Sequence, residues 1–457
     1  MSKKSIELEP TKENLLEAIA EDLIERNELV WNLVMLCNDQ NDNYSVAIDG
    51  KWGSGKTFFI KQAQMLIESA NPYDKKYTDI EKENICAAFE KYTTGGEKVS
   101  DCIINQVCVY YDAWMNDNDI DPLLSLVYSI LQQTGSSFVY ERDTDVLDIA
   151  ASIIDILIAR NVTKLIEKIR NKDILTDIRE TKDLYTLTNK FFDSILEEHG
   201  DRLVVFIDEL DRCKPTFAIQ LLERVKHYFS NDRITFIFAI NTVELQHTVK
   251  RYYGESFDAC RYLDRFFDNR ASLSSPNLAK YHQKHGIYIG PSSFQYICKK
   301  IITQYNFSLR EIGRFTHMMK SIEKEARIFR DYSGFGEDNA RRFAFIIIVP
   351  IIIGLRMYNT SLYNDFIEGK NCTPLIEIVG DGEDVIGICN LLLDKLESYE
   401  DTGGNQCTVI SLKERLKTAY EALFIEDLNY PNKECTVGQC IFRSVIRKEV
   451  LNAASML

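Results

Sequence analysis

The chain has 457 residues, of which 45% are hydrophobic and 27% charged, so it is long enough for two or three folded domains and disorder is not expected. Its net charge of −15 argues against nucleic-acid binding by the whole surface, although a local basic patch is still compatible with it. The twelve cysteines form no Cys-x-x-Cys pair and the chain opens without an apolar leader, so we expect free thiols and a cytoplasmic protein.

The first predicted elements are helices, because apolar residues recur with helical spacing over residues 15–37. We treat residues 1–43 as an N-terminal helical segment. A short apolar run of strand type follows at residues 44–49. A further helix is predicted at residues 58–69, since the Asn-Pro pair that comes after it ends a helix.

The loop between that strand and that helix reads G-K-W-G-S-G-K-T, which matches the phosphate-binding pattern G-x-x-x-x-G-K-[ST] in its expected setting. Its glycines let consecutive backbone N–H groups point at an anion, and the helix adds the positive end of its dipole. Lys56 is expected to reach the β- and γ-phosphates of ATP, and the Thr57 hydroxyl to ligate Mg²⁺. The residues expected to bind the nucleotide are Gly50, Lys51, Trp52, Gly53, Ser54, Gly55, Lys56, Thr57 and Phe58.

The next strand is predicted at residues 107–111 and runs into the sequence Asp-Ala-Trp. Asp121 followed by Pro122 then signals the start of a helix. Residues 141–199 have helical character throughout and lie between two predicted strands, where a minimal nucleotide fold needs one crossover helix. We interpret them as a helical insertion or lid, although a long connection is equally compatible with the sequence.

A continuous apolar run at residues 203–207 is of the kind that is buried on both faces of a sheet, and it ends at Asp208 and Glu209. Downstream of a phosphate-binding loop, Asp208 is placed to hold Mg²⁺ beside Thr57. Glu209 is placed to orient or deprotonate the attacking water as a general base. The run of apolar residues followed by two acids is a weak signal alone, and the loop before it makes the signal strong.

Two further strands are predicted, at residues 234–240 and 267–273. Asn241 follows the first of them, where its side chain either contacts the γ-phosphate or the water, or caps the next helix. Strands alternating with helices, several of them apolar throughout, predict an α/β fold with a parallel sheet. We therefore expect a P-loop NTPase core over residues 44–276.

Positive charge is also expected opposite the leaving group when a triphosphate is cleaved. We take Arg265 as the catalytic candidate. The other candidates are Arg261, Arg270, Arg310 and Arg314. Arg212 is expected instead to form an ion pair with Asp211 or another neighbour.

From about residue 277 the alternation of strands and helices ends, so an all-α C-terminal domain is predicted over residues 277–457. Its main helices are expected at residues 294–305, 309–330, 339–358, 376–399 and 409–424. Apolar runs at residues 149–158 and 343–355 are shorter than the roughly 20 residues that a membrane-spanning helix needs. We therefore expect buried helices there and no transmembrane segment.

Taken together, these motifs resemble the KAP family of P-loop NTPases. The matching stretches are residues 50–57, 111–114, 121–124, 206–213, 262–267 and 308–315. The resemblance implies an additional-strand ATPase core, in which the strand before Asn241 lies between the P-loop strand and the Asp208 strand, with helical insertions between the two Walker motifs. The family often has Asp where Glu209 stands, and Glu is chemically competent, so ATP hydrolysis is still implied.

The preferred hypothesis is an Mg²⁺-dependent ATPase that couples ATP binding and hydrolysis to a conformational change and controls a protein partner or effector subunit. The resemblance links bacterial relatives to anti-phage defence and implies ATP, and no Asn-Lys-x-Asp stretch for guanine is present. The alternative is a nucleotide-binding scaffold that assembles a homo- or hetero-oligomeric complex with little hydrolysis. Arginines between residues 327 and 342 leave nucleic-acid binding open, although an ordinary helix surface explains them better.

Overall fold

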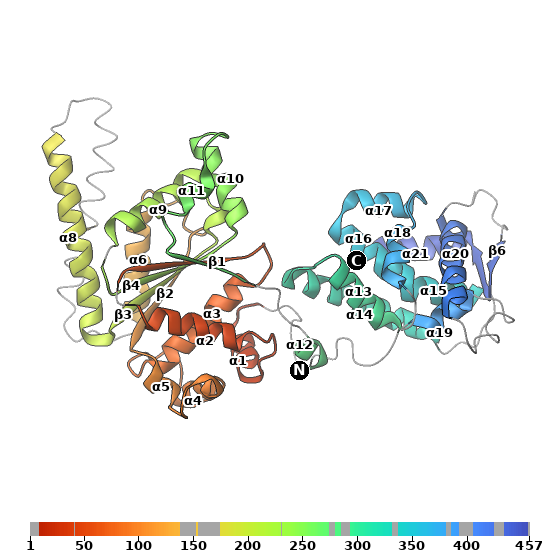
Figure 1. Ribbon diagram of the computed structural model, residues 1–457, viewed down its shortest axis with the longest axis horizontal. Helices are drawn as coiled ribbons and strands as arrows, with labels where there is room; N and C mark the ends of the chain where they lie inside the picture. The colour runs from red at the N-terminus through yellow and green to blue at the C-terminus, as the bar shows by residue number, and fades with distance from the viewer. Residues whose placement is uncertain are drawn as a thin grey trace. The chain divides into compact units, whose positions relative to one another are not determined.

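The computed structural model describes residues 9–40, 42–137, 152–153, 174–229, 231–273, 279–284, 293–330, 337–380, 385–392, 405–424 and 434–455 (Figure 1). The chain divides into two compact units, Glu9–Leu278 and Ala279–Leu457. Each unit has its own core, and the first contains the parallel sheet.

Five parallel strands form the sheet of the first unit, in the order β2-β3-β4-β1-β5. The strands are β1 (Tyr44–Asp49), β2 (Gln106–Asp112), β3 (Arg202–Asp208), β4 (Ile234–Ile240) and β5 (Asn269–Ser272). Strand β4 lies between β1 and β3, which confirms the additional-strand order that the resemblance implied. The register pairs Asp49 with Ile240 and Asp112 with Asp208, so the carboxyl ends of these strands meet at one edge.

The continuous apolar runs explain why β3 and β4 are central, since every residue of both strands is buried. Helices cover both faces of the sheet. Figure 1 shows α2 and α3 on one face and α9, α10 and α11 on the other. The helices of these layers are α1 (Lys12–Glu21), α2 (Asn27–Asn38), α3 (Lys56–Ala70), α9 (Pro215–Tyr228), α10 (Thr242–Tyr253) and α11 (Ala259–Leu263).

The described part of the predicted insertion is mainly one long helix, α8 (Ile174–His199). Phe191 and Phe192 near its C-terminal end are fully buried in the same core as β2 and β3. This end of the helix therefore packs on the sheet rather than standing free of it. Residues 141–151 and 154–173 of the predicted insertion lie outside the described residues.

The segment between β2 and α8 begins a helix where the sequence predicted one. The Asp121 carboxylate accepts a hydrogen bond from the Leu123 backbone N–H at 2.9 Å, and Pro122 occupies the first turn of α6. The remaining elements of the first unit are α4 (Asp79–Ala87), η1 (Glu90–Tyr92), α5 (Val99–Cys102), α6 (Pro122–Ser137) and η2 (Leu210–Arg212).

The second unit is mainly helical, but the expectation of an all-α domain was wrong. Strands β6 (Glu434–Val437) and β7 (Cys440–Arg443) form an antiparallel hairpin. Gly438, with φ 58°, supplies the left-handed backbone that a two-residue hairpin turn requires. Helices of this unit are α12 (Ala279–Lys284), α13 (Ser293–Gln304), α14 (Leu309–Arg330), α15 (Glu337–Phe343), α16 (Val349–Tyr358), α17 (Thr360–Ile367), α18 (Thr373–Val379), α19 (Ile386–Cys389), α20 (Asn405–Phe424) and α21 (Ser444–Ser455), with the π-helical segment η3 (Ala344–Ile348) and the 3₁₀ turn η5 (Asn390–Leu392).

The apolar run of the second unit is buried, as the sequence predicted. It spans η3 and α16, and a Cβ at Gly354 would lie 2.5 Å from Ile301 Cγ2 of α13, so the two helices pack closely. The single helix predicted at residues 376–399 was wrong, because α18 ends before Gly380, which has φ 60°. Among the described residues, every helix is too short or too polar to cross a membrane.

Candidate functional site

The phosphate-binding loop connects the end of β1 to the first turn of α3, at the carboxyl edge of the sheet. Gly53 and Gly55 have φ values of 78° and 87°, a conformation that other residues seldom adopt. A Cβ at Gly50 would lie 2.6 Å from Ser54 Oγ, so a side chain there requires the Ser54 hydroxyl to move. The glycines of the motif thus fix the shape of the loop.

The Lys56 side chain folds back into this loop. Its amine donates hydrogen bonds to the carbonyl oxygens of Gly50 at 2.6 Å and Lys51 at 3.3 Å. Burial lowers the pKa of Lys56, whereas the nearby carboxylates of Asp211, Asp208 and Glu209 oppose that shift. The amine therefore lies between the loop and an acidic cluster, and its hydrogen bonds to the two carbonyl oxygens hold it there.

Thr57 and Asp208 bring the two predicted Walker motifs together. The Asp208 side chain, which is 1% exposed, accepts a hydrogen bond from the Tyr110 hydroxyl at 3.0 Å, and the Thr57 side chain lies beside it. Burial raises the pKa of Asp208, and the Thr57 and Tyr110 side chains act against that shift. A hydroxyl and a carboxylate are oxygen ligands that Mg²⁺ prefers, so this donor set fits the ion that the sequence motifs predict.

Glu209 follows directly and is held in an unusual conformation. Its φ of 59° lies in the left-handed region, which costs a non-glycine residue roughly 1–2 kcal/mol. Its carboxylate forms an ion pair with Arg212, three residues further on. Burial raises the pKa of Glu209 to about 7, Asp208 adds to the rise, and Arg212 opposes it.

Two tryptophans surround Arg212. Its guanidinium lies 5.8 Å from the ring centroid of Trp52 and 5.6 Å from that of Trp114. The Trp52 indole N–H also donates to Asp211 Oδ2 at 2.5 Å. The expectation that Arg212 forms an ion pair with a neighbour was correct, and the neighbour is Glu209 rather than Asp211.

Asn241 directly follows β4, at the carboxyl edge of the sheet. Its side-chain oxygen accepts a hydrogen bond from the Glu244 backbone N–H at 3.4 Å and so caps α10. The adjacent Thr242 backbone N–H donates to Asp49 Oδ1 at 2.8 Å, which ties the end of β1 to the end of β4. Asn241 is thus at the predicted edge of the sheet, and capping is the contact that the structure gives it.

Arg265 lies at the opposite edge of the sheet. It precedes β5, and the residues around it contact the start of β1: the Asp268 N–H donates to the Ser45 carbonyl at 2.9 Å, and Ser45 Oγ donates to the Phe266 carbonyl at 2.7 Å. The length of β1, roughly 20 Å for six residues, separates this edge from Lys56. Arg265 is exposed, and this separation is longer than an arginine side chain, so Arg265 does not reach a phosphate bound beside Lys56 in its own chain.

The other candidate arginines are placed as follows. Arg261 lies exposed on α11, at the same edge as Arg265. Arg270 pairs with the Asp264 carboxylate at 2.7 Å. Arg310 and Arg314 are exposed on α14 of the second unit.

Three residues of this region escaped the sequence analysis. Tyr110 contacts Asp208, and the Lys61 amine lies 3.1 Å from the Tyr110 ring centroid, where burial lowers its pKa to about 8. Arg26, which is 1% exposed, donates from Nη2 to the Ser54 carbonyl at 3.2 Å and supports the loop from behind. The strand register and the helix packing that create these contacts are not visible as a sequence motif.

In the second unit, the arginines considered for nucleic-acid binding are partly engaged elsewhere. Arg341 forms ion pairs with Glu337, Asp338 and Glu449, the last at 2.9 Å. Residues 331–336 of that region lie outside the described residues. An arginine neutralised in this way has little charge to offer a phosphate backbone.

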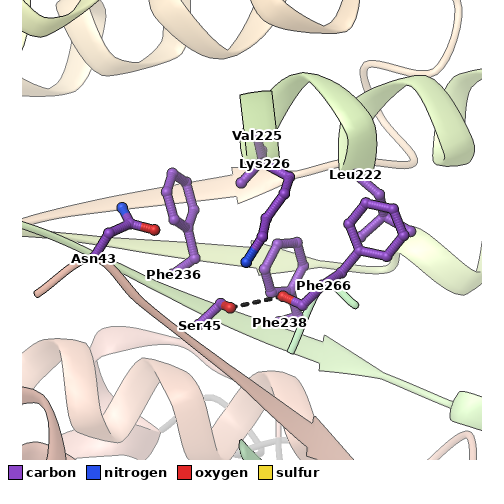
Figure 2. Close-up of a pocket in the computed structure, with 8 residues that line it drawn as sticks. All are labelled: Asn43, Ser45, Leu222, Val225, Lys226, Phe236, Phe238 and Phe266. Carbon is purple, nitrogen blue, oxygen red and sulfur yellow. Dashed lines mark hydrogen bonds between the residues drawn. The ribbon is translucent and has the colours of Figure 1, made fainter. Parts of the chain in front are cut away.

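A small pocket lies on the first unit, at the amino edge of the sheet (Figure 2). It lies beside the start of β1, where Ser45 donates to the Phe266 carbonyl, and it has room for about one water molecule. Its lining residues are Asn43, Ser45, Leu222, Val225, Lys226, Phe236, Phe238 and Phe266. The position separates it from the phosphate-binding loop, so the pocket is no part of the candidate site.

The sheet order, the phosphate-binding loop and the acids across from it define a P-loop NTPase domain of the additional-strand class. A family model described as the KAP family P-loop domain matches residues 27–284, more than half of the 457 residues, and the chain belongs to this family. The search of curated proteins gave no match. Among solved structures, the Aeropyrum pernix ORC2 protein in ADPNP-ADP complexes is similar at 13% identity and a TM-score of 0.32, over 92% of this chain and 99% of that chain, a level that implies nothing about function.

Proposed function

We propose that the protein is an Mg²⁺-dependent ATPase whose site lies at the carboxyl edge of the sheet. The observation that carries this proposal is that the phosphate-binding loop, in which the Lys56 amine lies, meets the buried Asp208 carboxylate at one edge of the sheet, with the Thr57 side chain beside Asp208. The loop proposed to bind the phosphates therefore lies beside the strand that ends in the carboxylates. Binding of an Mg²⁺-bound triphosphate requires both the loop and the carboxylates.

In this proposal, different groups of the loop bind the phosphates of the nucleotide. The backbone N–H groups between Gly50 and Phe58 surround the β- and γ-phosphates, with the positive end of the α3 dipole behind them. The Lys56 amine leaves the carbonyls of Gly50 and Lys51 to bind phosphate oxygens, since a phosphate is a far stronger acceptor than a carbonyl.

Thr57 and Asp208 would hold Mg²⁺, which when bound neutralises charge on the β- and γ-phosphates. Glu209 orients the attacking water and accepts its proton. Asn241, at the end of the neighbouring strand, is placed to contact the γ-phosphate or that water once the site is filled. Arg265, at the other edge of the sheet, serves a nucleotide held by a neighbouring subunit in an oligomer.

We further propose that hydrolysis changes the arrangement of the helical second unit and so controls a protein partner, in bacterial anti-phage defence. The support for this step is the KAP family membership and the size of the second unit, Ala279–Leu457. Comparison of the proteins that co-purify with the chain in ATP, in ADP and without nucleotide tests it. A partner set that does not respond to nucleotide would contradict control by hydrolysis.

The direct test of the enzyme is phosphate release by the purified protein with ATP and Mg²⁺. We expect Lys56→Ala to abolish release and Glu209→Gln to lower it by at least 100-fold, the usual range for a general base. Lys226→Ala is the matched control, because Lys226 lies at the pocket on the opposite edge. Tight ATP binding without phosphate release, even with protein partners added, would favour the alternative hypothesis of a nucleotide-binding scaffold.

A further inference from the structure

Two exposed tryptophans at the carboxyl edge are not used by the proposed function. Trp52 belongs to the phosphate-binding loop and is 47% exposed, and Trp114 follows the end of β2 and is 51% exposed. An exposed tryptophan alone is ordinary, but two of them beside a candidate active site direct attention to the group that both contact. The third tryptophan of the chain, Trp31, is 7% exposed in α2.

The guanidinium of Arg212 contacts both indoles, at 5.8 Å and 5.6 Å from the ring centroids. A planar, permanently charged guanidinium suits stacking on aromatic faces better than a lysine amine does. The Trp52 indole also donates to Asp211, the residue before Arg212. The loop and the turn after β3 are therefore joined by two contacts through one tryptophan.

Arg212 in turn contacts the side chain of Glu209. The short helix η2 (Leu210–Arg212) turns the chain so that Arg212 forms an ion pair with the Glu209 carboxylate three residues earlier. The Glu209 backbone is held in the left-handed region, with φ 59°, and its N–H donates to Asp208 Oδ1 at 2.9 Å. Strained backbone of this kind persists where the surrounding structure fixes it. Both the backbone and the side chain of Glu209 are therefore held.

We propose that Arg212, held between Trp52 and Trp114, is the positioning residue for Glu209 in ATP hydrolysis. This inference rests on the proposed function, in which Glu209 is the general base. It also explains the two tryptophans, because they fix the guanidinium that orients the carboxylate. Since Trp52 is part of the phosphate-binding loop, the same contacts align the base with the bound phosphates.

The test measures kcat and KM for ATP in Arg212→Ala, Glu209→Gln and the double variant. We expect Arg212→Ala to lower kcat roughly 10- to 100-fold, as misplacement of a reacting group does, with KM changed less than about threefold. In the Glu209→Gln background the same substitution has no further effect, because Arg212 acts through Glu209. Equal fold losses in the two backgrounds, or a kcat unchanged or raised by Arg212→Ala, would overturn the inference.

Arg224→Ala is the matched control. Arg224 also pairs with a carboxylate, that of Asp121 at 3.4 Å, and lies 5.5 Å from the Tyr228 ring centroid, but outside the site. It should lose stability without losing kcat. A wild-type protein that releases no phosphate would refute the proposed function itself, whereas an active wild type with an equally active Arg212→Ala refutes the inference alone.

A second readout needs no hydrolysis. In a Trp31→Phe background, acrylamide quenching of fluorescence reports on Trp52 and Trp114 together. We expect Arg212→Ala to raise the quenching constant by about half or more, because the guanidinium no longer covers the indole faces, while Arg224→Ala leaves it unchanged. Unchanged quenching in Arg212→Ala would show that the guanidinium does not lie between the rings, and would overturn the proposed arrangement.

Discussion

Tyr110 is the residue through which β2 supports the candidate magnesium ligand. Its hydroxyl donates to Asp208 Oδ2 at 3.0 Å, and a hydrogen bond to a charged group is worth roughly 1.5–3 kcal/mol. We expect Tyr110→Phe to weaken binding of Mg²⁺-loaded ATP about tenfold and binding of metal-free ATP much less, since the ring stays in place. Calorimetric titration with and without Mg²⁺ measures both affinities.

Tyr128→Phe is the control for this substitution, because Tyr128 is 61% exposed on α6. It should leave both affinities as in the wild type. An equal loss of affinity with and without Mg²⁺ in Tyr110→Phe would contradict a role through Asp208.

Glu209 should make stability depend on pH. Burial raises its pKa from 4.5 to about 7 in the folded state, so ionisation disfavours folding, and stability present below pH 4.5 is lost as pH rises through 7. After a discount for its partial exposure, we expect Glu209→Gln to be more stable than the wild type by about 1 kcal/mol at pH 8. The difference should vanish near pH 4. Thermal denaturation at both pH values tests this, and a variant less stable than the wild type at pH 8 would contradict it.

At the scale of elements, the phosphate-binding loop depends on its left-handed glycines. Gly53 has φ 78°, so Gly53→Ala puts a Cβ on a residue with left-handed backbone. This costs roughly 1–2 kcal/mol of stability or forces the loop to change shape. We expect at least a tenfold loss of ATP affinity, measured by titration. Gly96→Ala is a matched control, because Gly96 has φ 79° with nothing near its added Cβ. If both substitutions lower stability but neither lowers affinity, the loop does not bind phosphate.

The strands and the loop could be predicted because their signals are local: apolar runs for β3 and β4, and a glycine pattern between a strand and a helix for the loop. The β6–β7 hairpin was missed because its four-residue strands carry too little periodicity to stand out among helices. Tyr110 and Arg26 could not be assigned, since their contacts with Asp208 and Ser54 depend on strand register and on the packing of a helix from another part of the chain.

At the scale of the whole molecule, the two edges of the sheet have separate roles in the proposed function. Lys56 is at the carboxyl edge and Arg265 at the amino edge of the same sheet, so in the proposed function Arg265 acts on a nucleotide bound by a neighbouring copy of the chain. We expect Arg265→Ala to lower kcat roughly 1,000-fold, as loss of an arginine supplied by a neighbour does. Arg251→Ala, an exposed arginine on α10, should leave kcat unchanged.

Mixing Arg265→Ala with Lys56→Ala tests whether the arginine comes from a second subunit. Each variant lacks a different part, so a mixed oligomer contains some sites with an intact Lys56 and an intact Arg265 from the neighbour. We expect the mixture to regain part of the wild-type phosphate release. A mixture as inactive as its components, at concentrations where light scattering shows oligomers, would contradict this arrangement.

The sequence predicted one helical region after the sheet, and contacts within the chain separate Ala279–Leu457 as a second compact unit. The NTPase core could be assigned in detail because phosphate chemistry restricts residue types and spacing. The second unit shows no motif of comparable specificity in its described residues, where the buried apolar run of η3 and α16 is explained by packing. The proposed control of a protein partner is therefore tested by co-purification rather than by motif analysis.

The measurement that tests the account most directly is equilibrium titration of the protein with Mg²⁺ and a non-hydrolysable ATP analogue, by calorimetry, in wild type, Lys56→Ala and Asp208→Asn. We predict one analogue bound per chain in the wild type and at least a 100-fold loss of affinity when Lys56 is replaced. In Asp208→Asn, Mg²⁺ should no longer increase the affinity for the analogue. Equal affinity in all three proteins, or no binding by the wild type, would contradict a magnesium–triphosphate held between the loop and the acids of β3.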